Sequence, residues 1–443
     1  MNKLTKLFAL LFLSSFLFVA CSEDDETPIQ PTPTPEETSV RVIHASYDAP
    51  AVDIWVDGAV AISNLAYGSS SGYATLPAGT RNIKVSPTGA SSPIVIDVDL
   101  QVDANNEYTV IATGQLSNIT PIVAVDQRGI NVNKAKIRFI HGSPDAPAVD
   151  IKVEDGMGAA LFSNVSFQDI KEYIEVDAGT YNIAVTPAGS TQEVVILGNV
   201  PLTNGLVYTV LARGTLDASD SVPFEVRTFV DNDAGTAFVD LMAATSNVKV
   251  VHASPDAPSV DLLVNDAIAG SGLSFPNNTG YLNITSGTKN IKVNVAGTST
   301  TAIEADVLFN AYKNFSVFAV DAVANISPLV IEDDLTVPAP GKAHVRFIHL
   351  SPDAPSVDIT LTDGTVVFGN RAFKEFTAFT PLDAGSYDLQ VRVAGTSTVA
   401  LNLGTITVTE GNIYTVFAKG FLSGNGAQAL GAEIIVNNLL LNN

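Results

Sequence analysis

Four copies of one ten-residue phrase carry the side chains in this chain that could do chemistry. The first copy reads HASYDAPAVD and begins at His44, and each copy holds a histidine, an aspartate in its middle and a second aspartate at its end. Imidazole and carboxylate groups bind divalent cations, and they also act as general acids and bases. The twelve candidate residues are His44, Asp48, Asp53, His141, Asp145, Asp150, His252, Asp256, Asp261, His349, Asp353 and Asp358.

Each phrase lies between two short apolar segments that read as strands. Val40, Val42 and His44 alternate along the first segment, so the histidine is expected to face inward at a strand end. Asp53 falls on the outward face of the second segment, in a row that we expect to face solvent, and only Asp48 in the turn could reach either side. This geometry favours a structural role, in which the turn aspartate bonds backbone amides and the histidine bonds that carboxylate or a backbone carbonyl. A cation site in each module is the alternative, with its metal left unknown.

Two further phrases repeat with the first and define four modules. One is YATLPAGTRNIKV at Tyr73 and the other is YTVIATG at Tyr108. Short apolar segments between turn residues are typical of a β-sandwich. The sequence therefore predicts an all-β fold of four tandem immunoglobulin-like β-sandwich modules of about seven strands each. The expected domains are a lipoprotein signal peptide (1–20), an acidic Pro/Thr-rich tether (21–39) and modules at 40–134, 135–235, 246–338 and 343–443.

The spacing of the histidines groups the modules in two pairs. His44 and His141 are 97 residues apart, as are His252 and His349, whereas His141 and His252 are 111 apart. The extra length lies around residues 229–247, which we interpret as a longer joint. The acidic groups at 231–233 and 332–334 are expected to be solvated turns in the joints.

Composition excludes some classes of function. The chain has 23 basic and 46 acidic residues, a formal net charge of −23, which repels polyphosphate, so no nucleic-acid partner is expected. Its single cysteine, Cys21, precedes every repeat and permits no intramolecular disulfide.

The first forty residues predict the location of the protein in the cell. Basic residues precede an apolar stretch from Leu7 to Ala20, which ends in Phe18-Val19-Ala20-Cys21 and resembles the lipobox of a bacterial lipoprotein. We expect cleavage and lipidation at Cys21, which would make the membrane a partner. The acidic run that follows resembles the surface-export signal of Bacteroidetes lipoproteins. The expected location is the outer membrane, with the lipid-anchored protein facing the cell exterior.

The repeated phrases also carry a family resemblance. The SPDAP-x-VD phrase, the AGT or AGS turn and the YTV strand resemble a bacterial domain of unknown function, number 4397 among such families. The resemblance implies a fold, tandem repeats and an extracytoplasmic location, but no catalytic residue and no cofactor.

Enzyme motifs are weak in this sequence. Gly68-Ser69-Ser70-Ser71-Gly72 matches the nucleophile pattern G-x-S-x-G but lacks the strand–turn–helix context that the motif requires. We therefore expect no enzyme and no cofactor, and interpret the chain as a binding, adhesion or display protein with an unknown protein or glycan partner. The alternative is a glycan-binding accessory lipoprotein of a nutrient-uptake system. The aromatic residues considered for such a site are Trp55, Tyr67, Tyr73, Tyr173, Tyr181 and Tyr387.

Overall fold

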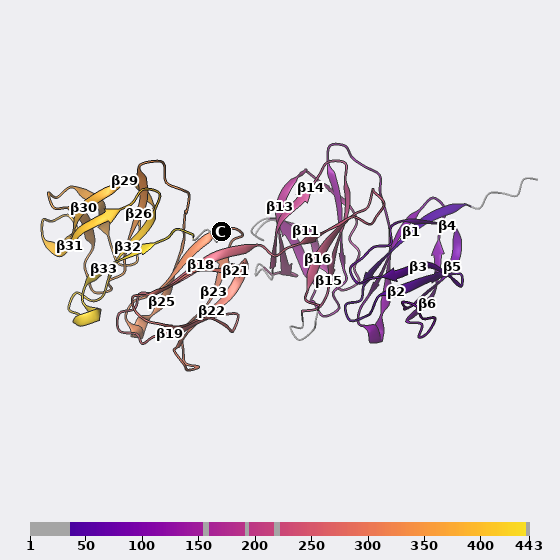
Figure 1. Cartoon of the computed structure of the whole chain (residues 1–443), viewed down its shortest axis with the longest axis horizontal. Coiled ribbons are helices and arrows are strands. Elements are labelled where there is room, and N and C mark those ends of the chain that lie inside the picture. The colour runs from indigo at the N-terminus through magenta and orange to yellow at the C-terminus, as the bar shows by residue number, and fades with distance from the viewer. Residues whose placement is uncertain (1–35, 154–158, 191–194, 217–221, 440–443) are drawn as a thin grey trace, which may run out of the picture.

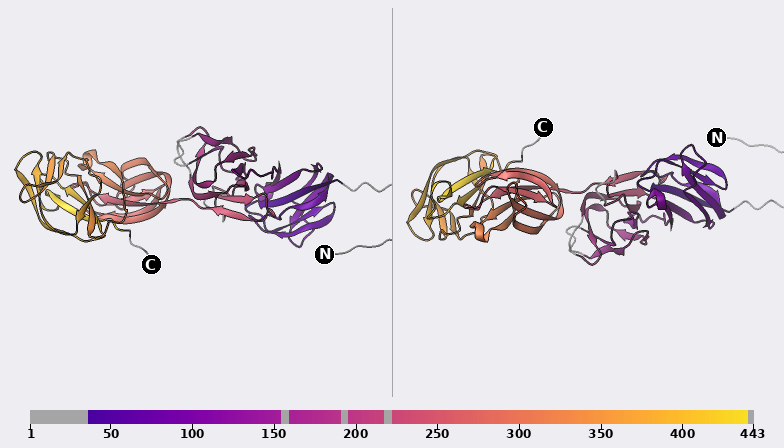
Figure 2. Two further views of the ribbon diagram at one scale, coloured as in Figure 1. Left: turned by 90° about the horizontal axis from the view of Figure 1, so that it is seen from above. Right: turned by 90° about the horizontal axis from the view of Figure 1, so that it is seen from below.

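The computed structural model describes residues 36–153, 159–190, 195–216 and 222–439. These residues form four β-sandwich modules that follow one another along the long axis of the molecule (Figure 1), and the views from above and below show the same row (Figure 2). No helix in this part of the chain is long and apolar enough to cross a membrane. Cys21, the predicted signal peptide and nearly all of the predicted tether lie outside the described residues.

Module 1 is a sandwich of two four-stranded sheets. The inner sheet has the order β4-β1-β7-β8 and the outer sheet the order β3-β2-β5-β6. Its central strands β1 and β7 run parallel, and their other neighbours are antiparallel. The strands are β1 (Glu37–Ala45), β2 (Val52–Val56), β3 (Ala59–Leu65), β4 (Ala74–Pro77), β5 (Gly79–Pro87), β6 (Ile96–Val102), β7 (Glu107–Thr113) and β8 (Thr120–Val125).

The other modules repeat this plan. Module 2 contains β9 (Ala135–His141), β10 (Val149–Val153), β11 (Ala160–Val165), β12 (Ile174–Val176), β13 (Gly179–Pro187), β14 (Val195–Leu202), β15 (Val207–Arg213), β16 (Glu225–Val230) and β17 (Phe238–Leu241). Module 3 contains β18 (Thr245–His252), β19 (Val260–Val264), β20 (Ala267–Leu273), β21 (Asn278–Thr285), β22 (Gly287–Val295), β23 (Thr301–Phe309), β24 (Asn314–Val320) and β25 (Ser327–Glu332). Module 4 contains β26 (Lys342–His349), β27 (Val357–Leu361), β28 (Val366–Arg371), β29 (Thr380–Asp383), β30 (Gly385–Val393), β31 (Val399–Val408), β32 (Ile413–Lys419) and β33 (Gly431–Val436).

The inner sheets are buried on both faces. Along β1, Val40 and Val42 pack into the core of module 1, whereas Ile43 on the opposite face packs against module 2. The same division runs along β7, where Val110 faces the module core and Ile111 faces the neighbouring module. Burial on two faces explains why these strands read as nearly continuous apolar runs, while the outer strands alternate.

The modules pack in pairs through their inner sheets. In the first pair, side chains from β1, β7 and β8 form one apolar cluster with Ile140, Leu211 and Phe229 of module 2. In the second pair, Phe318 of module 3 meets Phe417 of module 4 edge to face, with ring centroids 6.0 Å apart. A pair is therefore a stack of four sheets, and the predicted division into two pairs is present in the structure.

Two details of the predicted organisation differ from the structure. Module 1 has eight strands rather than about seven, because β3 is a bulged and mostly exposed edge strand whose sequence lacks a clear apolar alternation. Module 2 extends beyond its predicted end at residue 235. Within the segment interpreted as a joint, β17 pairs antiparallel with β16 and buries Leu241 in the module core.

Replacing Phe417 by alanine tests the pairing of modules 3 and 4. Loss of a fully buried phenylalanine costs about 3–5 kcal/mol, so the unfolding transition of the second pair, followed by circular dichroism in denaturant, should shift by about that amount. The exposed Phe376→Ala change is the control and should cost less than about 1 kcal/mol. An equal effect of both changes would contradict the packing described here.

Candidate functional site

The histidine of each phrase is buried at the end of the first inner strand. His44 is inaccessible to solvent, and its Nε2 lies 2.9 Å from the carbonyl oxygen of Pro50. Because a carbonyl can only accept, Nε2 carries the proton. The equivalent distances for His141, His252 and His349 are 3.2, 3.0 and 3.0 Å. Burial lowers the pKa of all four imidazoles, which favours their neutral form. The hydrogen bond from each imidazole to a proline carbonyl fixes the turn that follows.

The middle aspartate joins the phrase to a distant loop. Asp48 accepts a hydrogen bond from the backbone N–H of Leu116, at 2.6 Å, just after β7. The same contact recurs from Leu216 to Asp145, from Val323 to Asp256 and from Leu422 to Asp353. This carboxylate therefore bonds a backbone amide far along the chain rather than one within its own turn.

The last aspartate holds the outer sheet together. Asp53 accepts backbone N–H groups of Asn64 and Gly89, both at 2.8 Å, and so bridges the end of β3 to the turn after β5. These backbone donors lower the pKa of Asp53. Asp150, Asp261 and Asp358 accept the corresponding pairs of amides. Asp53 is covered by these segments and does not lie in the open row that the sequence suggested.

The three polar positions of a phrase therefore do not converge. Each histidine bonds a carbonyl in its own turn, and the two aspartates bond backbone amides in different places. Across the described ranges, no group of three or more histidine, cysteine, aspartate or glutamate side chains is arranged to hold a metal ion.

A second polar cluster, which sequence reasoning missed, lies between modules 1 and 2. Arg41 of module 1 forms a buried ion pair with Asp231 of module 2, and Arg138 of module 2 forms one with Asp126 of module 1. Thr109 and Thr209 connect the two ion pairs. The hydroxyl of each accepts a hydrogen bond from Nε of the arginine in its own module at 2.8 Å and donates one to the aspartate of its own module.

Tyrosines complete the coordination of both carboxylates. The hydroxyl of Tyr73 donates to Asp126 at 2.7 Å, and that of Tyr173 donates to Asp231 at 2.6 Å. Each tyrosine ring also lies beside the arginine of its own module, 5.0 Å from Arg41 and 4.6 Å from Arg138. The cluster therefore has a pseudo-two-fold arrangement, with each module supplying one arginine, one aspartate, one threonine and one tyrosine.

These contacts correct the expectation that residues 231–233 and 332–334 are solvated acidic turns. Asp231 is fully buried, and Asp333 is buried against Arg346 of module 4, with 2.7 Å between Nη1 and Oδ1. The sequence held the necessary signal. A basic residue stands three positions before every motif histidine, and an aspartate or asparagine follows the strand after every closing phrase. Pairing between modules explains both.

The second pair keeps one half of this network and replaces the other half. Arg346 and Asp333 repeat the ion pair of Arg138 and Asp126. In the other half Lys249 stands for Arg41 and Asn437 for Asp231, with 2.6 Å between Nζ and Oδ1. Phe379 occupies the position equivalent to Tyr173. Module 4 therefore lacks the phenolic hydroxyl that donates to the carboxylate of Asp231 in module 2, and the amide of Asn437 replaces that carboxylate.

Within the described part of the chain, Lys249 is consequently a buried amine without a carboxylate partner in direct contact. Burial lowers its pKa to about 8, and the charge of Asp333 only partly opposes that shift. Burial alone would also lower the pKa of Arg41, but Asp231, Tyr73 and Asp126 together outweigh burial, so the pKa of Arg41 lies above its usual value.

The aromatic residues considered for glycan binding serve structural contacts. Tyr73 and Tyr173 belong to the buried network, and Tyr67 packs edge to face on His44. The hydroxyls of Tyr181 and Tyr387 donate to backbone carbonyls of Asp177 and Asp383. Trp55 is half-buried, and its indole N–H donates to Ser86 at 2.9 Å.

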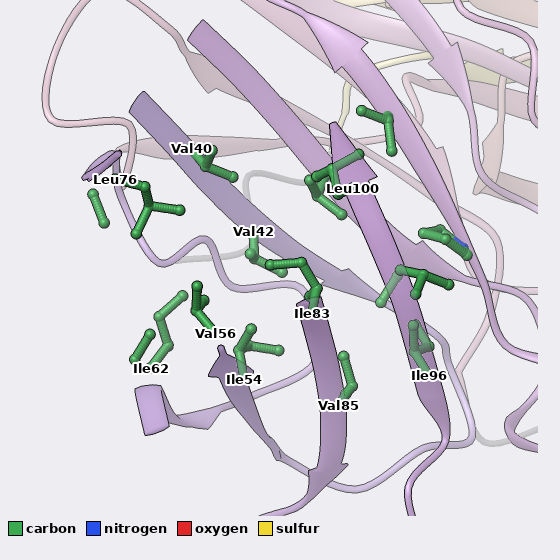
Figure 3. A pocket seen from close by; sticks show the side chains of 17 residues that line it. Val40, Val42, Ile54, Val56, Ile62, Leu76, Ile83, Val85, Ile96 and Leu100 are labelled. Carbon is green, nitrogen blue, oxygen red and sulfur yellow. The ribbon is translucent and has the colours of Figure 1, made fainter. Parts of the chain in front are cut away.

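The core of module 1 contains an apolar cavity of about 50 Å³ between its two sheets (Figure 3). Its walls include Val42, Ile54 and Ile62. The corresponding cavities in modules 2 and 4 are about 20 and 30 Å³, and phenylalanines form part of their walls. An apolar cavity of this size stays dry and offers no polar group to orient a substrate, so it is a packing difference.

Comparisons with known proteins agree with the repeats. The family model described as Domain of unknown function (DUF4397) matches residues 38–152, 135–245, 246–360 and 360–439. No curated protein matches the chain. Among solved structures, the Bacillus anthracis TIE protein is 10% identical, and the match covers 87% of this chain and 68% of that one. Its TM-score is 0.17, so that likeness carries no argument here.

Titration of Lys249 should make the free energy of unfolding of the second pair depend on pH. Between pH 8 and 10.5 the unfolded lysine binds a proton that the folded one has released, so stability rises with pH in this window. From pH 7.5 to 10, the unfolding free energy of the second pair should rise by about 2 kcal/mol more than that of a Lys249→Met variant. Denaturation at both values measures this difference, and identical pH profiles would show that Lys249 is not desolvated as described.

Proposed function

Because the chain belongs to the family described as Domain of unknown function (DUF4397), and its four modules form a row of sandwiches, we propose that it is a lipid-anchored cell-envelope protein with a binding, adhesion or display role and no catalytic one. The observation that carries this proposal is the joint occurrence of a lipobox-like cysteine, an acidic Pro/Thr-rich segment and a row of paired β-sandwich modules. A row of modules behind a tether extends away from its attachment point.

Anchoring is supported by the sequence before module 1. An apolar stretch with basic residues ahead of it and Cys21 behind it has the layout of a lipoprotein signal. Several acyl chains at one residue would hold the protein stably, since each buried methylene contributes about 0.8 kcal/mol. The alternating Pro and Thr residues up to Glu37 favour an extended tether, and the acidic run supports export to the outer face.

Extension away from the membrane is supported by the packing. Paired inner sheets make each half of the molecule one stack of four sheets, and module 4 lies at the opposite end of the row from module 1 (Figure 2). The joint between the halves is short. Between β17 and β18 the N–H of Ala244 donates to Ile196 at 2.7 Å, and Tyr312 of module 3 contacts Asn199 of module 2.

A non-catalytic role is supported by how the repeated polar residues are used. The motif histidines and aspartates bond backbone groups in all four modules and have little capacity left for a substrate. The glycan-binding alternative has less support, because the considered tyrosines and Trp55 bond within the protein rather than forming an exposed aromatic platform.

Lipidation is tested by metabolic labelling with an alkyne fatty acid in a Gram-negative host that expresses the full chain. The wild-type protein should be labelled and sediment with membranes, a Cys21→Ala variant should lose both properties, and Ser22→Ala should retain them. Protease treatment of intact cells then distinguishes the outer face, where the modules are cut, from the periplasm. An unlabelled wild-type protein would refute anchoring through Cys21.

A further inference from the structure

In modules 1, 3 and 4 the inner sheet ends on the strand that follows the closing phrase, whereas in module 2 β17 is added beyond that strand. The four strands after the closing phrase are equivalent, because each lies beside the same central strand, in which an alanine marks the register. The residues opposite that alanine in modules 1 to 4 are Pro121, Val226, Pro328 and Ala432.

This position determines whether another strand can be added. In module 2 the backbone N–H of Asp231 points toward the central strand β15 and donates to the carbonyl oxygen of Val207 at 2.7 Å. The N–H of Val230 points to the opposite, outer side of the sheet and donates to the carbonyl oxygen of Ala237 at 3.1 Å. N–H directions alternate along a strand, so Val226 also directs its N–H toward the outer side. A proline here removes one of the donors that an added strand would use.

The four edges are treated differently. Modules 1 and 3 have proline at this position, a common protection of exposed edges, and module 2 covers its edge with β17. Module 4 has neither, since Ala432 retains its N–H and no strand in the described part of the chain pairs with the outer side of β33. Ile434 and Val436 on this edge are 39% and 51% exposed.

Strand β17 shows what such an edge accepts. It runs antiparallel to β16, with Leu241 opposite Val226 and buried in the module core. Asp240 lies opposite Arg227 and forms an ion pair with it, while the ring of Phe238 lies 3.7 Å from that guanidinium. Aliphatic, acidic and aromatic positions thus match the residues of β16.

The charge is reversed on the open edge. Glu433 of β33 takes the place of Arg227, and Lys419 takes that of Arg213 and contacts Glu433 at 2.7 Å. In a strand added to β33, an acidic residue at the position of Asp240 would be repelled by Glu433, whereas a basic residue there would be attracted to it. The net charge of −23 also favours a basic partner.

We infer that β33 binds an extended segment of a partner protein by strand addition. The segment runs antiparallel to β33, with an aliphatic side chain opposite Ala432 and a lysine or arginine opposite Glu433. Main-chain hydrogen bonds supply the binding energy and the alternate side chains supply the selectivity. This inference goes beyond the proposed function, because strand addition does not depend on an acylated Cys21.

The probe is a fluorescent synthetic peptide that spans Thr236–Ala243 of this chain with Asp240→Lys. Full-length protein should bind it saturably in an anisotropy titration, and hydrogen exchange should slow at the amides of residues 432–436. Ala432→Pro should weaken binding at least tenfold, and Ala432→Val, which copies module 2, should leave it within about twofold. Prolines at the equivalent positions of modules 1 and 3 show that the fold accommodates a proline at this position. Circular dichroism checks that the Ala432→Pro variant is folded.

The outcomes separate the parts of the inference. Absence of peptide binding to the wild type, or equal binding to Ala432→Pro, would overturn strand addition at β33. Equal affinity for the peptide that retains Asp240 would overturn the basic position. Self-association of the protein that Ala432→Pro abolishes would replace the partner segment by a second copy of the chain. Loss of lipid labelling would leave all these results unchanged, so the two proposals fail independently.

Discussion

The buried contact between a cation of one module and a carboxylate or amide of the next constrains the rest of this molecule. Removing two charges from water is expensive, and the cost is recovered only when both are paired and their remaining hydrogen-bonding groups are satisfied. In the first pair, Asp126 and Asp231 each receive an arginine from the other module and a threonine and a tyrosine from their own. Neither carboxylate can be satisfied within one module, so the network requires the face-to-face arrangement of the inner sheets.

This constraint explains why the inner and outer sheets differ. An inner strand such as β1 alternates between the core of its own module and the neighbouring inner sheet, and therefore has no solvent-exposed face. The outer sheets retain an exposed face and are held by Asp53 and its equivalents. The conserved pattern within the chain is thus divided: the ten-residue phrase stabilises each module, and the preceding cation together with the distant aspartate joins two modules. Substitutions in the second pair change Arg to Lys, Asp to Asn and Tyr to Phe in one half of the network, which keeps donors and acceptors matched.

Much of the fold could be predicted from the sequence because it is repeated. The four modules, their grouping in pairs and the inward position of His44 follow from phrase spacing and from the two-residue period of strands. The edge strand β3 and the added strand β17 could not be predicted, because neither alternates clearly and both depend on a neighbour for their hydrogen bonds. Asp231 and Asp333 were misjudged for a related reason. An aspartate after a strand resembles a solvated turn until its partner, far away in the sequence, is known.

The most direct test is a double-mutant cycle between Arg138 of module 2 and Asp126 of module 1. Trp55, the only tryptophan, lies in module 1, so its fluorescence reports that module during denaturation. Single changes Arg138→Met and Asp126→Asn should each cost about 3–5 kcal/mol, since each leaves a buried group unpaired. The double variant should be at least about 2 kcal/mol more stable than the sum of the two effects predicts. Additive effects would contradict a shared network between the modules.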